Sequence, residues 1–438
     1  MFCMHRQPKK QSKCMVQNTS QTGIMRLRTA AFKRQQYALK MEKLMKKKIN
    51  DLKNIGRVLL MGNLLVFSCL AATAGAEEND LPSYIVEAVD APQVADLICE
   101  GEMQLDFAQQ FQVYFYQDGY ELLDITQSGQ YLLIPEDKEV PEGLDESITV
   151  LQKPLDHIYL QATSAMALFR ALDSLDNIKM TGTQAEGWYI EETVERMENG
   201  EMLFAGKYSE PDYEMLVDEG CDLALESTML LHSPKVQEML EMLGIPVLIE
   251  RASYETEPLG RTEWIKVYGV LTGKLDQATE FFESRKEVIR ELSDFENTEK
   301  VAAFFYITTD GKAVVRSSAD YVPAMIDMAG GRYAFDGIVD EDGKTSVSMT
   351  MESFYEKARD ADYIIYNASI DATVKTINDL IAKDPIFAEF KAVKEGNCYS
   401  TGSNMYQRTD VISNMIMDFH KVFTGEEDGD LEFLTKLE

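Results

Sequence analysis

The sequence predicts an α/β protein built from two lobes that one long helix joins. Three observations predict this fold. Short apolar runs alternate with helical patterns from residue 148 onward, one amphipathic pattern is much longer than the others, and 45% of the 438 residues are hydrophobic. A chain of this length and composition can bury two sizeable cores, whereas collagen, low-complexity disorder and a small disulfide scaffold are excluded.

The N-terminal region is typical of a targeting segment. Residues 46–48 are all lysine, and the apolar run 58–72 that follows is too short to span a bilayer comfortably. We predict a signal peptide over 45–76, cleaved after Ala76 or acylated at Cys69 as in a bacterial lipoprotein; an uncleaved membrane anchor is the alternative. Residues 1–44 lie upstream of this signal, and we interpret them as a gene-model extension or a disordered segment.

Residues 77–147 are expected to form a small N-terminal β meander. Within them, Phe111, Val113 and Phe115 alternate with polar residues, which is the period of a strand with one buried face. Asp-Gly at 118–119 and Ser-Gly at 128–129 predict two turns, so the segment 111–134 predicts antiparallel strands.

Strands alternate with helices in the remainder of the chain, which favours parallel layers of the Rossmann-like kind. We predict an N-terminal α/β lobe over 148–272 and a C-terminal α/β lobe over 298–438. The expected strands are 148–151, 158–160, 223–225, 247–249, 301–307, 363–366 and 398–400, and the clearest helices are 164–175 and 234–243.

A long helical pattern separates the two lobes, within an interlobe segment of 273–297. Apolar residues at 275, 278, 282, 289 and 292 recur near helical spacing, and charged residues fill the opposite face. Gly273 ends the preceding helix, 262–271, so the long helix is expected over 275–296. It would be a stiff connection between the lobes; an ordinary surface helix inside one lobe is the alternative.

Charge excludes one class of partner. The chain carries 43 Lys and Arg against 74 Asp and Glu, and because residues 1–76 hold 15 basic residues and only Glu42 and Asp51, the remaining 362 residues have a net charge of −44. Residues 77–438 therefore repel polyanions, and this argues against nucleic-acid binding. The cysteines form no C-x-x-C pair, and we interpret those of the body, Cys99, Cys221 and Cys398, as buried small side chains.

No catalytic motif is present in the sequence. The four histidines do not lie at metal-ligand spacing, and neither H-E-x-x-H nor G-x-S-x-G occurs. The segment 337–345 is one residue too long for a phosphate-binding loop, and Lys344 occupies the position where a calcium loop needs an oxygen ligand. We expect no catalytic residue, no metal site and no cofactor, and binding is favoured over catalysis.

Four passages resemble the iron-complex and cobalamin class of ABC-importer substrate-binding proteins, which includes siderophore and haem carriers. The segment 255–274, reading Glu-Thr-Glu-Pro-Leu-Gly-Arg-Thr-Glu-Trp at its start, is similar to the stretch before that family's connecting helix. The passages 211–225, 240–247 and 351–365 resemble successive parts of its two lobes. The resemblance covers about 148–423 and implies two lobes on a rigid interlobe helix, with the ligand in the cleft between them.

The resemblance also implies roles for particular residues. In this family one glutamate on each lobe docks with arginines of the membrane permease, and by motif these positions are Glu214 and Glu352. A carboxylate that is merely favoured at the start of a helix is the alternative.

Loops that follow strands at the interlobe edge should bind the ligand, because ligands of open α/β sheets bind beyond the carboxyl ends of the strands. Arginines would pair with anionic groups of the ligand, and aromatic rings would stack on its planar parts. For the aromatic residues the alternative is core packing, and Arg261 could instead brace its helix. The candidates are Trp188, Tyr189, Tyr208, Arg261, Arg316, Tyr406 and Arg408.

The expected function is therefore that of an extracytoplasmic solute-binding protein, located in the periplasm or on the outer face of the cell membrane. It would be a monomer that captures a metal chelate, most simply a ferric siderophore, and delivers it to an ABC importer permease. Haem or a cobalamin-type corrinoid is an alternative ligand. Alternatives from other classes are a metal-insertion or tetrapyrrole-modifying enzyme of similar fold, which the signal segment disfavours, and a surface adhesin.

Overall fold

The computed structural model describes residues 82–290, 292, 295–340, 344–426 and 431–438. The predicted extension 1–44, the signal peptide 45–76 and its Cys69 lie outside the described residues. Within them, no helix combines the length and the apolar character needed to cross a membrane.

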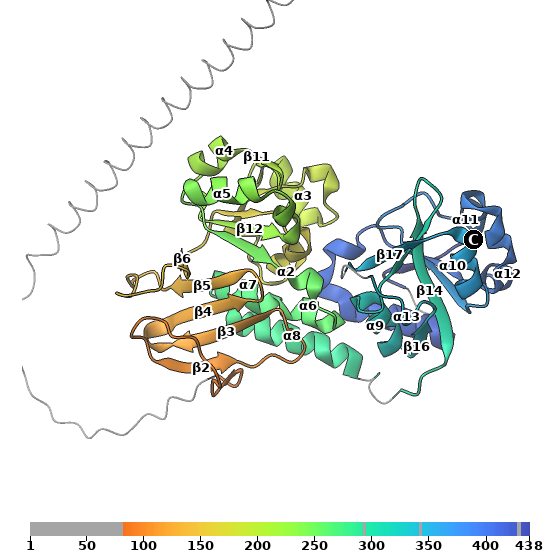
Figure 1. Cartoon of the computed structure of the whole chain (residues 1–438), viewed down its shortest axis with the longest axis horizontal. Coiled ribbons are helices and arrows are strands. Elements are labelled where there is room, and N and C mark those ends of the chain that lie inside the picture. The colour runs from red at the N-terminus through yellow and green to blue at the C-terminus, as the bar shows by residue number, and fades with distance from the viewer. Residues whose placement is uncertain (1–81, 291, 293–294, 341–343, 427–430) are drawn as a thin grey trace, which may run out of the picture. The chain divides into compact units, whose positions relative to one another are not determined.

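The first sheet of the described chain has six strands in the order β1-β2-β3-β4-β5-β6 (Figure 1). Strands β3 to β5 are the predicted antiparallel meander, with Phe111 opposite Ile125 and Leu123 opposite Tyr131. The predicted strand 148–151 does not open the first lobe, because β6 pairs in parallel with β5 and completes the meander's sheet. The strands are β1 (Ile85–Val86), β2 (Cys99–Met103), β3 (Phe111–Tyr116), β4 (Tyr120–Ile125), β5 (Gly129–Ile134) and β6 (Thr149–Gln152).

The N-lobe is built on a five-stranded sheet in the order β13-β12-β7-β8-β9, in which every pair is parallel. Strands β7, β12 and β13 are almost fully buried, which explains their apolar runs, whereas the edge strand β9 is partly exposed. The strands are β7 (Ile158–Leu160), β8 (Ile178–Thr181), β9 (Leu203–Phe204), β12 (Leu223–Ser227) and β13 (Val247–Glu250), with the hairpin β10 (Gly206–Lys207) and β11 (Glu210–Pro211). The helices are α2 (Met166–Ala171), α3 (Glu191–Glu198), α4 (Tyr213–Asp218) and α5 (Pro234–Met242).

Three helices follow the N-lobe sheet: α6 (Pro258–Glu263), α7 (Ile265–Thr272) and α8 (Leu275–Arg290). Gly273 has a left-handed φ of 72° and ends α7, as the sequence predicted. A Cβ on Gly269 would lie 2.7 Å from the Cβ of Ala278, so this glycine lets α7 and α8 pack closely.

The long helix α8 packs against α7 and against α13 (Ile412–Thr424) of the C-lobe. It ends at Arg290 rather than at residue 296, because the amide of Leu292 donates to the carbonyl of Ile289 in a tighter turn. Its 16 residues span ~24 Å, so it connects the lobes as a short rigid helix.

The C-lobe has a seven-stranded sheet in the order β17-β15-β14-β18-β19-β20, with β16 paired to β14. Parallel strands form its centre and antiparallel strands its edges, and stacked aromatic rings such as Phe305 and Phe387 fill its core. The strands are β14 (Lys300–Ile307), β15 (Ala313–Arg316), β16 (Gly331–Tyr333), β17 (Ser346–Met349), β18 (Tyr363–Tyr366), β19 (Cys398–Thr401) and β20 (Leu434–Lys436). The helices are α9 (Tyr321–Met328), α10 (Met351–Ala358), α11 (Ile377–Lys383), α12 (Lys391–Glu395) and α13.

Candidate ligand-binding cleft

A cavity of about 500 Å³ is lined by residues of both lobes. One wall consists of η5 (Thr228–His232) and η6 (Ala252–Tyr254), the short helices that follow β12 and β13. The other wall comes from the end of β15, the start of β17, and η8 (Met405–Gln407) after β19. Strands β12 and β13 are parallel, and β19 is parallel to β18; ligands of α/β sheets bind beyond the carboxyl ends of such strands. The lining residues are Thr228, Met229, Leu231, His232, Ser253, Tyr254, Arg261, Arg316, Lys344, Thr345 and Tyr406.

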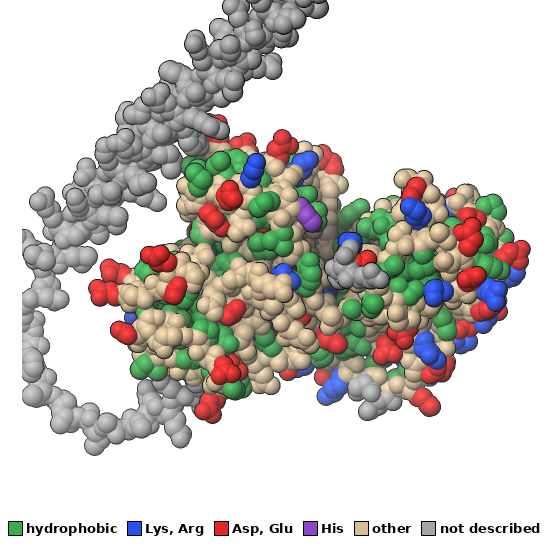
Figure 2. Space-filling model, in the orientation of Figure 1, with side chains coloured by type: hydrophobic (Ala, Val, Ile, Leu, Met, Phe, Trp, Pro, Cys, Tyr) green, Lys and Arg blue, Asp and Glu red, His purple; other side chains and the backbone are tan. Residues whose placement is uncertain are grey.

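A second cavity of about 200 Å³ continues this cleft and shares four of its lining residues, Ser253, Tyr254, Lys344 and Thr345. In the space-filling view the surface is notched between the lobes, and acidic side chains are spread over both of them (Figure 2). The cleft is thus a groove with a cationic and aromatic lining on a molecule whose surface is otherwise rich in carboxylates.

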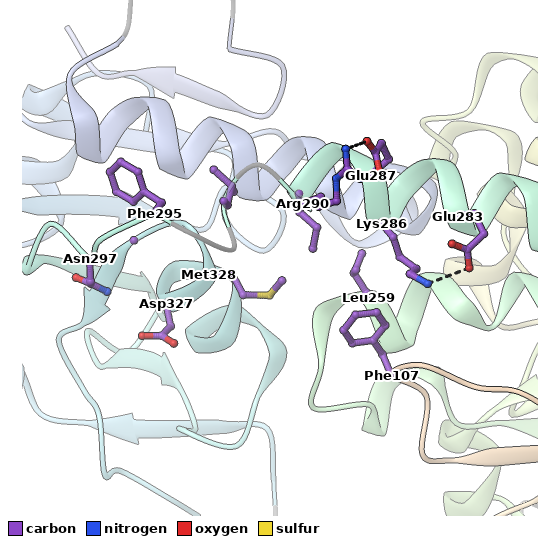
Figure 3. Close-up of a pocket in the computed structure, with 13 residues that line it drawn as sticks. Phe107, Leu259, Glu283, Lys286, Glu287, Arg290, Phe295, Asn297, Asp327 and Met328 are labelled. Carbon is purple, nitrogen blue, oxygen red and sulfur yellow. Dashed lines mark hydrogen bonds and ion pairs between the residues drawn. The ribbon is translucent and has the colours of Figure 1, made fainter.

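A larger cavity, of about 740 Å³, lies along α8 (Figure 3). Its walls are helix side chains and segments that precede strands, such as Leu259, Lys286 and Asn297. Because none of its lining residues follows the carboxyl end of a strand in either lobe, we take the smaller cavity as the ligand site despite the difference in volume.

Two arginines of the cleft are held in place by neighbouring groups. The guanidinium of Arg316 forms two parallel hydrogen bonds with Asp320, at 2.9 Å and 2.5 Å. Burial opposes the charge of Arg316, but the facing carboxylate outweighs it and raises the pKa of Arg316 above its usual value. Arg261 donates to the carbonyl of Ser253 at 2.7 Å, and its guanidinium lies 3.6 Å from the ring centre of Tyr321. Both arginines are therefore pre-oriented.

Tyr406 lies in the same cavity and is also fixed by a neighbour. Its hydroxyl accepts a hydrogen bond from the side-chain amide of Asn367 at 2.8 Å. The amide oxygen of Asn367 is buried and has no partner among the described residues. The predicted residues Arg261, Arg316 and Tyr406 thus meet in one cavity although they lie far apart in the sequence.

The other four candidates do not line the cavity. Trp188 is buried in the core and donates to the carbonyl of Thr183 at 3.2 Å, so it has the packing role that was its alternative. The amide of Tyr189 donates to Gln407 at 2.9 Å in a contact between the lobes. Tyr208 lies in the turn between β10 and β11.

Arg408 belongs to an ion network that joins the lobes. It pairs with Asp410 at 3.2 Å, and the same carboxylate accepts from Arg170 of α2 at 2.5 Å. Asp410 is almost fully buried, so its two arginine partners compensate a charge that would otherwise be costly. The pair Arg170–Asp410 therefore joins the two lobes, and Arg408 supports its carboxylate from within the C-lobe.

Sequence reasoning missed the apolar side of the cleft. Met229, Leu231 and Tyr254 are 46%, 53% and 44% exposed, which is unusual for large apolar side chains. His232 and Lys344 complete the set of lining residues that were not anticipated. For the N-lobe residues, the position shortly after the predicted strands 223–225 and 247–249 was the available signal, but the prediction selected residues by type; Lys344 follows no predicted strand.

Buried glutamates end the two N-lobe strands that lead into the cleft wall. Glu226 of β12 is fully buried and neither of its oxygens has a partner among the described residues, so burial raises its pKa to about 8. Burial also raises the pKa of Glu250 on β13 to about 7, although Arg261 and a hydrogen bond from Tyr268 oppose the shift.

Asp156, His157 and Asp222 form a group of metal-ligand type in the described part of the chain. His157 and Asp222 precede β7 and β12, so the group lies at the amino ends of these strands, away from the cleft. One oxygen of Asp222 already accepts the amides of Asp156 and His157, which gives the carboxylate a structural role.

The predicted docking glutamates both lie in the first turn of an exposed helix. Glu214 is on α4 of the N-lobe and Glu352 is on α10 of the C-lobe (Figure 1). Hydrogen bonds from its own amide and from Thr350 lower the pKa of Glu352. Each carboxylate is exposed and free of salt bridges among the described residues.

Two α/β lobes on a connecting helix, with a cleft at the carboxyl ends of their strands, define a bilobal solute-binding protein. The model of the periplasmic binding protein family matches residues 169–405, which is more than half of the chain. The chain belongs to this family. Its members bind solutes, so the protein is a binding protein rather than an enzyme, and the alternative of a metal-insertion or tetrapyrrole enzyme is set aside.

Two relatives are uncharacterized lipoproteins of Methanocaldococcus jannaschii. One is 24% identical over 324 residues, covering 69% of this chain and 74% of the relative. The other is 24% identical over 400 residues, covering 87% of this chain and all of the relative.

Solved structures confirm the fold. A periplasmic heme binding protein from Pseudomonas aeruginosa is 12% identical with a TM-score of 0.51, covering 65% of this chain and 98% of its own. The triscatecholate siderophore binding protein of Bacillus subtilis, complexed with ferri-bacillibactin, is 15% identical with a TM-score of 0.50, covering 63% and 94%. These similarities establish the two-lobed architecture that the sequence predicted.

Proposed function

We propose that the protein captures a metal chelate outside the cytoplasm, most simply a ferric siderophore, and delivers it to an ABC importer. The observation that carries this proposal is the cavity in which Arg261, Arg316 and Tyr406 converge between the lobes. Guanidinium groups pair with catecholate or carboxylate oxygens, and an aromatic ring packs on planar parts of a ligand. A volume of about 500 Å³ lies within the range of small-molecule sites.

The structural neighbours support this ligand class. One is described as binding a triscatecholate siderophore and another as binding haem. The family and the lipoprotein relatives likewise favour a location outside the cytoplasm.

Haem or a corrinoid is the second candidate, and the apolar wall of the cleft favours it. Met229, Leu231 and Tyr254 would cover a flat apolar macrocycle, and His232 at the same wall has an imidazole that could bind a metal. A tetrapyrrole would direct its carboxylates toward the arginines.

Calorimetric titration of the secreted chain against a panel tests the ligand. The panel contains a ferric triscatecholate, a ferric hydroxamate, haem and cyanocobalamin. We expect binding of one class in the micromolar range or tighter, and about a tenfold loss for Arg261→Met, since a charge-assisted contact is removed. Absence of binding to every member would refute the proposal.

Glu214 and Glu352 are proposed to dock with the importer's permease. Exposed carboxylates fixed on two separate rigid elements can each accept bidentate contacts from arginine. We expect Glu214→Lys with Glu352→Lys to abolish uptake of the bound chelate by cells while leaving its affinity unchanged. Reversal at Glu356, which is exposed near the end of α10, is the matched control; uptake that survives the double reversal would contradict docking at these residues.

A further inference from the structure

The segment 104–110, which joins β2 to β3, is bound to the connecting helices by its backbone. Five successive amides, those of residues 106–110, donate to two carboxylates. The acceptors are Glu255, which precedes α6, and Glu263 at the end of α6, and both are buried. A buried carboxylate that accepts several amides fixes the backbone that donates them.

Glu263 binds the first half of this segment. It accepts the amides of Asp106, Phe107 and Ala108 at 2.8–2.9 Å, and its negative charge is compensated by Lys266 at 2.7 Å. Lys266 also donates to the carbonyl of Gln104 at 3.1 Å. Glu263 therefore joins the first sheet to α6 and α7, and none of the residues it contacts lines the cleft.

Glu255 binds the second half and belongs to the cleft wall. It accepts the amides of Gln109 at 2.9 Å and Gln110 at 3.0 Å, and the indole N–H of Trp264 at 3.0 Å. Residues 253–256 line the smaller cavity that continues the cleft, and Ser253 and Tyr254 line the main cavity as well.

A second contact runs from the same segment to the same wall. The side-chain oxygen of Gln110 accepts from Arg251 at 3.4 Å, and the guanidinium of Arg251 lies 4.3 Å from the ring centre of Tyr254. Arg261 in turn donates to the carbonyl of Ser253. The wall 251–256 is thus held from the first sheet on one side and from α6 on the other.

The packing around this contact is close. A Cβ on Gly260 would lie 3.1 Å from the carbonyl oxygen of Phe107 and 3.3 Å from an oxygen of Glu255. Phe107 lies beside Leu259 of α6, below Lys286 of α8 (Figure 3). Lys286 is also paired with Asp106 at 2.5 Å. The segment 104–110 therefore has little freedom to move away from the helices.

We propose that Glu255 is a positioning residue of the ligand cleft, through which the six-stranded sheet sets the conformation of the wall 251–256. The six-stranded sheet lies outside residues 169–405, which the family model matches. The inference rests on the proposed function for its effect on affinity, but its effect on the wall does not require a ligand.

Glu255→Gln and Glu263→Gln form a matched pair of variants for the test. Each places an amide nitrogen opposite backbone donors of the segment 104–110, and both should lower the thermal stability. In the ligand-free chain, we expect hydrogen–deuterium exchange of 251–256 to rise about tenfold in Glu255→Gln and to change less than about twofold in Glu263→Gln.

The same pair is then titrated with the member of the chelate panel that the wild type binds best. Glu255→Gln should weaken binding about tenfold, and Glu263→Gln should not. Equal exchange of 251–256 in the two variants would overturn the inference, whether or not a ligand is known. Failure of the wild type to bind any chelate, with the exchange difference present, would refute only the proposed function.

Gln110→Ala is a second variant for the case in which Glu255→Gln does not fold. It withdraws the acceptor of Arg251 and leaves Glu255 and the backbone amides intact. We expect exchange of 251–256 to rise about threefold, since a weaker contact is lost. Unchanged exchange in this variant would overturn the inference.

Discussion

The two lobes carry buried acidic side chains beside the same cleft but stabilise them in different ways. In the C-lobe, Asp320 is buried and paired with Arg316, which forms two hydrogen bonds with it. In the N-lobe, Glu226 is buried without any partner among the described residues, and its raised pKa keeps it protonated. The C-lobe thus compensates its buried acidic side chain with an ion pair, whereas the N-lobe side chain is buried in its neutral form.

The same difference continues on the surface of the cleft. The N-lobe wall exposes Met229, Leu231 and Tyr254 beside Arg261, whereas the C-lobe wall provides Arg316, Lys344 and Tyr406. This asymmetry teaches that neither lobe forms the site alone.

The largest expected effect tests the ion pair of the C-lobe. Arg316→Met should lower the free energy of unfolding by about 3 kcal/mol in urea denaturation, because the buried Asp320 loses its only cationic partner among the described residues and keeps just the amide of Val322. Arg332→Met is the control: its pair with Glu299 is 62% and 68% exposed, so the loss should stay below about 0.5 kcal/mol. Similar losses in the two variants would show that burial of the pair does not matter.

The second effect is a pH dependence of stability that tests the unpaired side chain of Glu226 in the N-lobe. The pKa of Glu226 rises from 4.5 in the unfolded chain to about 8 in the fold, so the folded state binds the proton more tightly. Stability should therefore fall as pH increases from 4.5 to 8, and level off above this range.

Glu226→Gln removes this titration, since an amide stays neutral. Its stability, measured by urea denaturation at several pH values, should fall less steeply than that of the wild type between pH 5 and pH 8. Glu250 titrates in the same direction in both proteins, so only the difference between the two curves reports on Glu226. Parallel curves would contradict a buried neutral glutamate.

The smallest expected effect tests the contribution of the apolar N-lobe wall of the cleft to ligand binding. Met229→Ala combined with Leu231→Ala removes exposed apolar area from the cleft and should weaken binding of the preferred chelate about tenfold in calorimetry. Met242→Ala on α5 is the control, because this side chain is 80% exposed and does not line the cavity. Unchanged affinity in the double variant would mean that the N-lobe wall does not touch the ligand.

The elements most accurately predicted from the sequence are those with purely local causes. Strands β7 and β18 begin and end where their apolar runs do, and Gly273 ends α7 because it adopts a left-handed conformation. The strand 149–152 was placed in the wrong sheet, since an apolar run does not specify its partner. The end of α8 at Arg290 was also missed, because the apolar period continues to Leu292, although the amide of Leu292 donates to the carbonyl of Ile289, three residues back.

The sequence by itself determined the alternation of strands and helices, the length of the connecting helix to within two turns, and the acidic character of the body. These features follow from residue type and spacing along the chain. Only the tertiary structure decided that Arg261, Arg316 and Tyr406 share a cavity while Trp188 and Arg408 do not. The reason is physical: a cleft is made by segments that are distant in sequence, and whether a side chain faces it depends on the neighbours that each sheet brings against it.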